Sequence, residues 1–147
     1  MPVISLFSGS YCNEKQVVQE IGAQTGYRLI TDREIVAEAS RLSDIPENRI
    51  ERVFDDKISV FNRLTRERER SLAHLRLALA KNLSEDDLII CGFAGQLIPR
   101  DIHHVLRVCL IADMTSRMAV AANAHRIAKP EALKIIHRDD EKCAAWI

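Results

Sequence analysis

Three short apolar runs, at residues 3–7, 88–91 and 105–111, constrain the fold of this chain more than any other feature. Each run has the length of a buried strand, and each is followed by a segment of helical sequence. Strands of this kind, separated by helices, favour a parallel sheet with crossover helices over an antiparallel meander. A fourth, shorter strand is predicted at 27–30. The pattern therefore predicts an α/β fold, a three-layer arrangement in which helices flank a parallel sheet.

Helices are predicted from apolar residues at three- and four-residue spacing and from signals at the helix ends. They cover residues 14–25, the segment after 32, 58–83, 113–127 and 130–147. Gly26 is expected to close the first helix, and Pro130 suits the first turn of the last one, because its missing N–H is not needed there. Three residues are expected to cap the starts of helices: Asn13, Asp32 and Asp113.

The composition excludes several classes of function. The chain has 147 residues, enough for one domain, expected to span 1–147, with 21 Lys and Arg against 21 Asp and Glu. Zero net charge argues against a general nucleic-acid binder or a polybasic membrane binder, because both need a surplus of cations. The four cysteines lack zinc-ligand spacing, and the first apolar run is too short for a signal peptide or membrane anchor. We therefore expect a cytoplasmic protein without a metal site.

The predicted last helix is still apolar where the sequence stops. Its apolar positions include Ile135, Ile136 and Trp146. Two explanations stay open at this point: the chain is a fragment of a longer protein, or this end packs against a partner chain.

The segment after the first strand partly matches a phosphate-binding loop. Such a loop needs glycines that free backbone N–H groups to surround a phosphate, then a Lys and a Ser or Thr that holds magnesium. In residues 9–16, GSYCNEKQ, Gly9 and Lys15 fit this pattern. Glu14 stands at the second glycine and would repel a phosphate, and Gln16 replaces the hydroxyl. The alternative is a plain strand-to-helix loop with Lys15 in solvent.

Charged residues at 66–70 alternate in sign, which is more typical of a solvated helix face than of a binding patch. Arg68 interrupts the apolar stripe of the predicted 58–83 helix. It either reaches into a cleft, where it would contact substrate, or lays its aliphatic stem along the surface. The histidines are expected at the surface, since no carboxylate or cysteine completes a metal-ligand set with them.

Several segments together resemble the cytidylate kinase-like family of P-loop proteins, relatives of the nucleoside monophosphate kinases. The similar segments lie at 4–17, 26–27, 32–39, 88–94, 105–112, 117 and 131–142. The resemblance covers nearly all of the chain. It implies the family's three-layer parallel fold, here without the last strand of the sheet.

The same resemblance implies a site. It gives Gly9 and Lys15 roles in the donor loop, Asp32 a role at the acceptor, and Arg117 and Arg138 contacts to the transferring phosphoryl group. The candidate catalytic residues are Lys15, Arg117 and Arg138. The candidate ATP-binding residues are Gly9, Ser10, Asn13, Lys15 and Gln16, and the candidate substrate-binding residues are Asp32, Arg68 and Lys142. If the domain is active, ATP with Mg²⁺ is the implied cofactor.

Three departures from the family pattern bear on activity. Glu14 adds a negative charge to the loop, Phe93 stands where the family usually has an arginine, and Lys142 replaces another arginine, which loses bidentate geometry. Because phosphoryl transfer depends almost entirely on positioning and electrostatics, these three substitutions are expected to lower the rate of transfer severely.

The expected function is therefore a non-catalytic or weakly active kinase-like domain that serves in regulation, nucleotide sensing or interaction. The alternative is an active nucleoside monophosphate kinase of the CMP type. A sheet without its last strand exposes an edge, which predicts a homo-oligomer, specifically a homodimer, or contact with another domain of a longer protein.

Overall fold

The computed structural model of the chain describes residues 3–55, 66–144 and 146. Its strands are β1 Val3–Ser8, β2 Arg28–Thr31, β3 Leu88–Cys91 and β4 Val105–Leu110. Its α-helices are α1 Glu14–Thr25, α2 Asp32–Ser43, α3 Glu47–Glu51, α5 Glu67–Leu83, α6 Met114–His125 and α7 Lys129–Ala144. Two short 3-10 helices are η1 Arg52–Phe54 and η2 Ala94–Leu97. Within the described residues, no helix is both long enough and apolar enough to cross a membrane.

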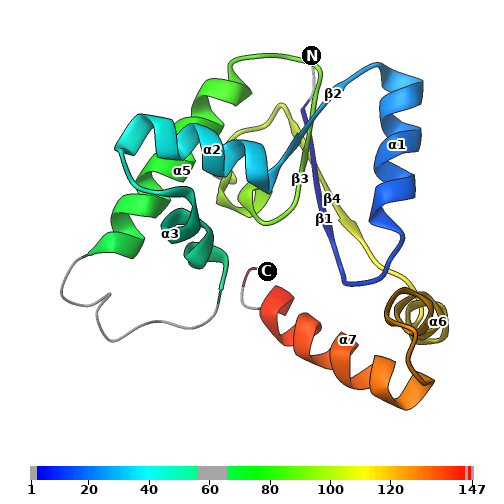
Figure 1. Cartoon of the computed structure of the whole chain (residues 1–147). Coiled ribbons are helices and arrows are strands. Elements are labelled where there is room, and N and C mark those ends of the chain that lie inside the picture. The colour runs from blue at the N-terminus through cyan, green and yellow to red at the C-terminus, as the bar shows by residue number, and fades with distance from the viewer. Residues whose placement is uncertain (1–2, 56–65, 145, 147) are drawn as a thin grey trace.

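The described strands form one parallel sheet in the order β2-β3-β1-β4 (Figure 1). Ile4 of β1 pairs with Ile89 on one side and with Leu106 on the other, so β1 is central. The predicted parallel α/β sheet is confirmed. Among these strands β4 is an edge, and because the strands are parallel, all of their carboxyl ends meet along one side of the sheet.

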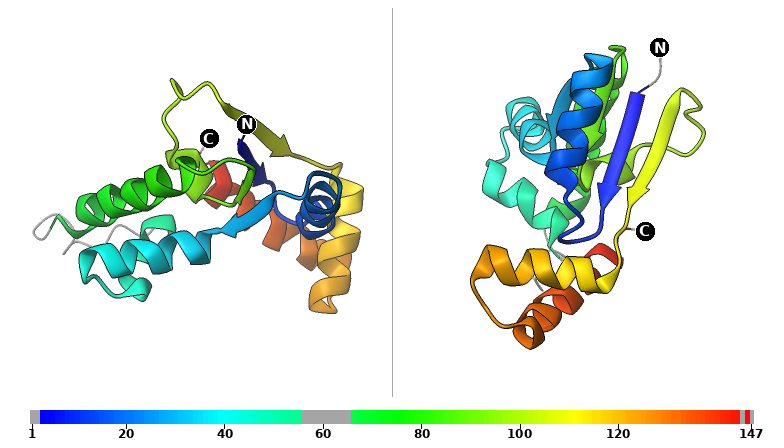
Figure 2. Two further views of the ribbon diagram at one scale, coloured as in Figure 1. Left: turned by 90° about the horizontal axis from the view of Figure 1, so that it is seen from above. Right: turned by 90° about the vertical axis from the view of Figure 1, so that its right-hand side faces the viewer.

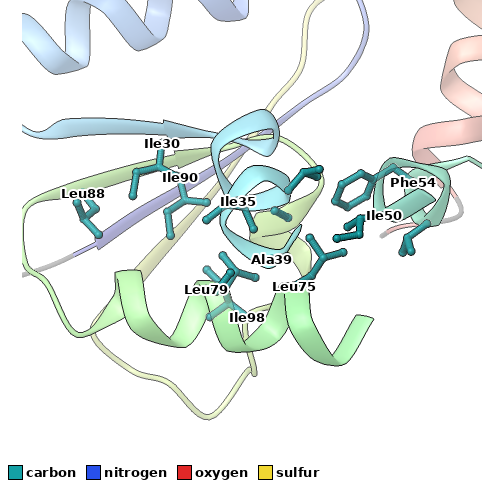
Figure 3. Close-up of a cluster of buried hydrophobic side chains, with 14 of the residues drawn as sticks. Ile30, Ile35, Ala39, Ile50, Phe54, Leu75, Leu79, Leu88, Ile90 and Ile98 are labelled. Atoms are coloured by element: carbon teal, nitrogen blue, oxygen red, sulfur yellow. The ribbon is translucent and has the colours of Figure 1, made fainter. Parts of the chain in front are cut away.

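Helices cover both faces of the sheet, which confirms the predicted three layers (Figure 2). On one face, Val18 of α1 packs against Leu6 of β1. On the other face, α2, α3 and α5 enclose the larger core, which Figure 3 shows. Ile35, Leu75 and Ile90 belong to this core and are fully buried. Removing such side chains from water is the main stabilising contribution.

Two of the predicted helix ends are confirmed. Gly26 ends α1 with a left-handed backbone (φ 72°), and its N–H donates to the carbonyl of Gly22 at 2.8 Å. Asp113 caps α6, because its carboxylate accepts the N–H of Ser116 at 2.9 Å and the hydroxyl of the same residue at 2.6 Å. These hydrogen bonds lower the pKa of Asp113.

Two other predicted caps are corrected. Asp32 is the first residue of α2 rather than its cap; Thr31 caps the helix through a capping box with Glu34. Asn13 occupies the position before α1, but its backbone is left-handed (φ 56°) and its side chain makes no capping hydrogen bond.

The predicted long helix over 58–83 is confirmed from Glu67 to Leu83. Its first positions, 58–65, lie outside the described residues. Arg66 has a left-handed backbone (φ 48°), so α5 begins at Glu67 and no regular helix runs continuously through this point. The apolar stripe of α5 packs against α2, with Leu75 and Leu79 buried.

Helices α6 and α7 form a pair beyond the carboxyl ends of the strands. Ala121 of α6 packs with Ala132 and Ile136 of α7, and all three are fully buried. Figure 1 shows α7 running below the sheet, from α6 toward the end of the α3 segment. This course places α7 opposite the loop that follows β1.

Candidate functional site

A cavity of about 560 Å³ lies between the β1–α1 loop and helix α7. Residues 8–15 form one wall. The opposite wall consists of Phe93 after β3, Val120 of α6, and three side chains of α7, namely Asp139, Lys142 and Cys143. The cavity therefore lies at the carboxyl ends of the strands, where open parallel sheets bind their ligands.

The loop makes its turn without a second glycine. Tyr11 and Asn13 both have left-handed backbones, with φ of 59° and 56°. The N–H of Gly9 donates to the carbonyl of Leu110 at 3.0 Å, and a Cβ at Gly9 would lie 3.3 Å from the Cys12 sulfur. Cys12 and the rest of the loop thus place side chains where a glycine-rich loop would leave its backbone open.

Arg117 of α6 joins the loop to α7. Its Nε donates to the Ser10 carbonyl at 2.8 Å, and one terminal nitrogen donates to the Ser10 hydroxyl at 2.8 Å. Both terminal nitrogens also bind the carboxylate of Asp140, one of them at 3.1 Å. The Arg117 side chain is only 11% exposed, and its hydrogen bonds to Asp140 raise its pKa.

A second contact fixes the loop against α6. The hydroxyl of Tyr11 lies 2.6 Å from Nε2 of His125 at the end of α6, and the two rings meet edge to face. Burial is the main cause that raises the pKa of Tyr11, and the negative charge of Asp139 adds to it.

Asp32, the first residue of α2, directly follows β2 and binds the turn after β3. Its carboxylate accepts the N–H of Phe93 at 2.9 Å and the N–H of Ala94 at 2.7 Å. Burial raises the pKa of Asp32, the two N–H groups oppose this, and the charge of Glu14 adds to it. Gly92 has a φ of 118°, and a Cβ there would lie 2.4 Å from an Asp32 oxygen, so only glycine fits.

Glu14 lines the cavity, and its carboxylate lies close enough to the thiol of Cys91, at the end of β3, for its charge to act on that thiol. Burial, and then the charge of Glu14, raise the pKa of Cys91 to about 12. The charge of Glu14 also acts on Asp32, so the Glu14 carboxylate lies near both Cys91 and Asp32.

An aromatic cluster fills the space beside this turn. The ring of Phe93 lies 5.9 Å from Phe54, 5.8 Å from Trp146 and 5.5 Å from Phe7, measured between ring centroids. Nζ of Lys142 is 5.8 Å from the centroid of Phe93 and 2.8 Å from a carboxylate oxygen of Asp55. We refer to Phe7, Phe54, Phe93 and Trp146 as the aromatic cluster.

The structure brings some of the predicted site residues together. Those that line the cavity are Gly9, Ser10, Asn13, Lys15 and Lys142. Arg117 lies behind the loop, where its guanidinium is bound to Ser10 and Asp140, and Asp32 binds the Phe93–Ala94 turn next to the cavity. The roles of these residues stay predictions.

Three predicted residues lie elsewhere. Gln16 is exposed in the first turn of α1, and Arg68 is half-buried on α5; neither lines the cavity. Arg138 is 74% exposed on α7 and pairs with the adjacent Asp139. Within the described residues, no three His, Cys, Asp or Glu side chains form a group that could hold a metal ion.

Sequence reasoning missed two features of the site. The pairing of Asp140 with Arg117 joins residues on two helices, and no local pattern indicates it. Two residues gave a visible signal for the aromatic cluster, since Phe93 replaces an expected arginine and Trp146 continues an apolar stripe.

Comparison with known proteins gives a family and a fold. The sequence model of the "Cytidylate kinase-like family" matches residues 3–147. No curated protein matches the chain. An uncharacterized protein from Eubacterium ventriosum ATCC 27560 has a similar structure, with a TM-score of 0.64, 10% identity and coverage of 95% of this chain and 74% of its own. A gluconokinase from Sinorhizobium meliloti 1021 also has a similar structure, with a TM-score of 0.52 and 16% identity. The match covers 96% of this chain and 74% of the gluconokinase. At these identities the structural likeness concerns the fold alone.

Proposed function

The chain belongs to the cytidylate kinase-like family, and on this premise we propose that it is a non-catalytic or weakly active kinase-like domain that binds nucleotide for sensing or regulation. The cavity between the β1–α1 loop and α7 is the proposed binding site.

The position of the Glu14 carboxylate carries this proposal. The start of a helix attracts anions, because its free N–H groups and the helix dipole favour negative charge there. In this chain Glu14, in the first turn of α1, lines the cavity and supplies a negative charge at that place, which also acts on Cys91 and Asp32. A phosphate bound there would meet this carboxylate, so the site is poorly suited to Mg-ATP and to phosphoryl transfer.

Lys15 supports the proposal that the site still binds nucleotide although it does not transfer phosphate efficiently. It is exposed on the cavity wall and has no ion pair with any other described residue. We expect calorimetric titration with ATP and CMP to give micromolar binding that Lys15→Ala weakens by about tenfold or more, since a charged hydrogen bond to phosphate is lost. Lys81→Ala, at the exposed end of α5, is the matched control and should leave binding unchanged.

The titration and an assay of phosphate transfer can each contradict the proposal that the domain binds nucleotide without efficient catalysis. Absence of binding at saturating nucleotide would contradict nucleotide sensing and leave an interaction module. Rapid, magnesium-dependent transfer of phosphate from ATP to CMP would contradict the non-catalytic assignment.

An active CMP-type kinase is the second candidate. One observation favours it: Gly9, Lys15 and Lys142 line one cavity, so the two cations face a shared space. This candidate requires turnover that Lys15→Ala abolishes. It fails if turnover is absent, or if that variant retains it.

We also propose a homodimer that pairs two β4 strands. Leu106 of β4 is 57% exposed and Ile111, just after β4, is 79% exposed, so two large apolar side chains are exposed within or directly after the same strand. No described strand pairs with the outer edge of β4. Antiparallel pairing about Val108 would place Leu106 of one copy opposite Leu110 of the other, on the same face.

Light scattering tests the dimer. We expect the mass of a dimer for the wild type and of a monomer for Leu106→Glu, because a charge in a cross-strand apolar pair opposes association. Leu77→Glu on α5, where the leucine is 47% exposed, is the matched control and should remain dimeric. A monomeric wild type at high concentration would rule out this interface.

A further inference from the structure

Helix α7 is attached to two other segments of the chain near its carboxyl end. The carboxylate of Asp140 binds Arg117 through both of its oxygens and lies 3.4 Å from the Ser10 hydroxyl, which donates to it. Near the end of the chain, Lys142 pairs with Asp55 at 2.8 Å, and the Trp146 ring lies 5.5 Å from that of Phe54. The first attachment holds the loop after β1, and the second holds the segment after α3.

In the first attachment, Arg117 and Ser10 bind the Asp140 carboxylate in the way that they would bind a phosphate. An arginine offers two parallel N–H groups that carboxylates and phosphates accept in the same bidentate geometry. The Ser10 hydroxyl is a further donor at the loop. Asp140 takes all of these donors, so Arg117 has no terminal nitrogen left without a partner.

The charge of the neighbouring Asp139 distinguishes the contact of Asp140 from a general effect of negative charge. Asp139 also lines the cavity, and its charge acts on Tyr11 across it. Its own ion pair, however, is with the exposed Arg138 and not with Arg117. Asp139 and Asp140 thus carry equal charges at adjacent positions, but only Asp140 binds the guanidinium of Arg117 behind the loop.

We propose that α7 is an autoinhibitory strap, in which the Asp140 carboxylate stands in for a ligand phosphate at Arg117 and Ser10. This inference rests on the proposed nucleotide binding and adds its regulation. A polyphosphate that enters the loop displaces Asp140 from Arg117. Because α7 continues into the contacts of Lys142 and Trp146, its release also separates Trp146 from Phe54 and Phe93.

The test compares two isosteric variants of the full chain. Inorganic tripolyphosphate and ATP are titrated against the wild type, Asp140→Asn and Asp139→Asn. We expect Asp140→Asn to raise affinity for both probes by about tenfold, because the competing charge is removed while the side-chain shape is kept. Asp139→Asn makes the same change in net charge and should raise affinity by about threefold at most.

Trp146 provides a second readout, since it is the only tryptophan in the chain. In the wild type, saturating tripolyphosphate should shift its emission to the red, as the ring leaves the aromatic cluster for water. Asp55→Asn breaks the exposed pair with Lys142 and should raise tripolyphosphate affinity by about twofold to fivefold.

Hydrogen exchange of α7 without any ligand separates failure of the strap from failure of the proposed function. Faster exchange in Asp140→Asn together with no binding of either probe would support the strap and overturn nucleotide binding. Unchanged exchange would overturn the strap. Equal gains in affinity for the two variants, or weaker binding by Asp140→Asn, would also overturn it, because Asp140 would then act as a general charge or as a support for Arg117.

Discussion

Replacing Gly92 with alanine should lower the free energy of unfolding by about 4 kcal/mol. The backbone at Gly92 has a φ of 118°, which L side chains rarely adopt at a cost of about 1–3 kcal/mol. The new Cβ would also lie 2.4 Å from an oxygen of Asp32, whose carboxylate binds the N–H groups of Phe93 and Ala94. Moving this carboxylate leaves buried N–H groups unpaired, at about 1–3 kcal/mol.

Urea denaturation of the variant measures this loss. Gly22→Ala is the matched control, because nothing lies within 4 Å of a Cβ at Gly22 and the residue is inside α1. That substitution should stabilise the protein by about 0.5–1 kcal/mol. In a double variant, Asp32→Ala should recover part of the Gly92→Ala loss, since the collision disappears. A loss of less than about 1 kcal/mol for Gly92→Ala would show that the turn can adapt.

Neutralising Glu14 should raise the affinity for ATP by about tenfold to a hundredfold. Two like charges about 5 Å apart near a protein surface repel by about 3 kcal/mol, and Glu14→Gln removes this repulsion while preserving the side-chain shape. The same change should lower the pKa of Cys91 from about 12, because the charge of Glu14 is one of the causes that raise it. Burial of the thiol remains, so its pKa stays above its ordinary value.

Calorimetry gives the affinity, and the alkylation rate of Cys91 at pH 9, followed by mass spectrometry, gives the thiol reactivity. Glu20→Gln, on the exposed middle of α1, is the control and should change neither quantity. Faster alkylation with unchanged ATP affinity would mean that the Glu14 carboxylate lies where the structure places it but is not what opposes phosphate. No change in either quantity would contradict the proposed role of Glu14.

Local sequence signals predicted the elements of this fold well. Apolar runs located the strands, because a strand covered on both faces needs apolar residues throughout, as in β3. Gly26 and Asp113 were predicted as helix ends because each acts on backbone groups only a few residues away. The capping box of Thr31 and Glu34 was equally visible as a Thr-x-x-Glu pattern, and the preference for Asp32 as a cap overlooked it.

The sequence predicted only the part of the site that belongs to a local motif, the loop from Gly9 to Lys15. The Gly9 to Lys15 spacing placed the loop at the cavity, and the departure at Glu14 was visible in the same motif. The partners of these residues were not predictable, because Asp32 binds a turn about 60 residues later in the chain and Arg117 pairs with another helix. Such contacts depend on how the layers pack.

The strand order also sets the sequence of events during synthesis. β1 emerges from the ribosome first, yet its neighbours in the sheet are β3 and β4, with Ile4 opposite Ile89 and Leu106. β2 likewise pairs with β3. No pairing between the described strands can form before residues 88–91 have emerged, and such distant pairings form slowly. The nascent chain therefore carries β1 as an unpaired apolar strand until residues 88–91 have been synthesised, and its folding depends on protecting that segment from other chains.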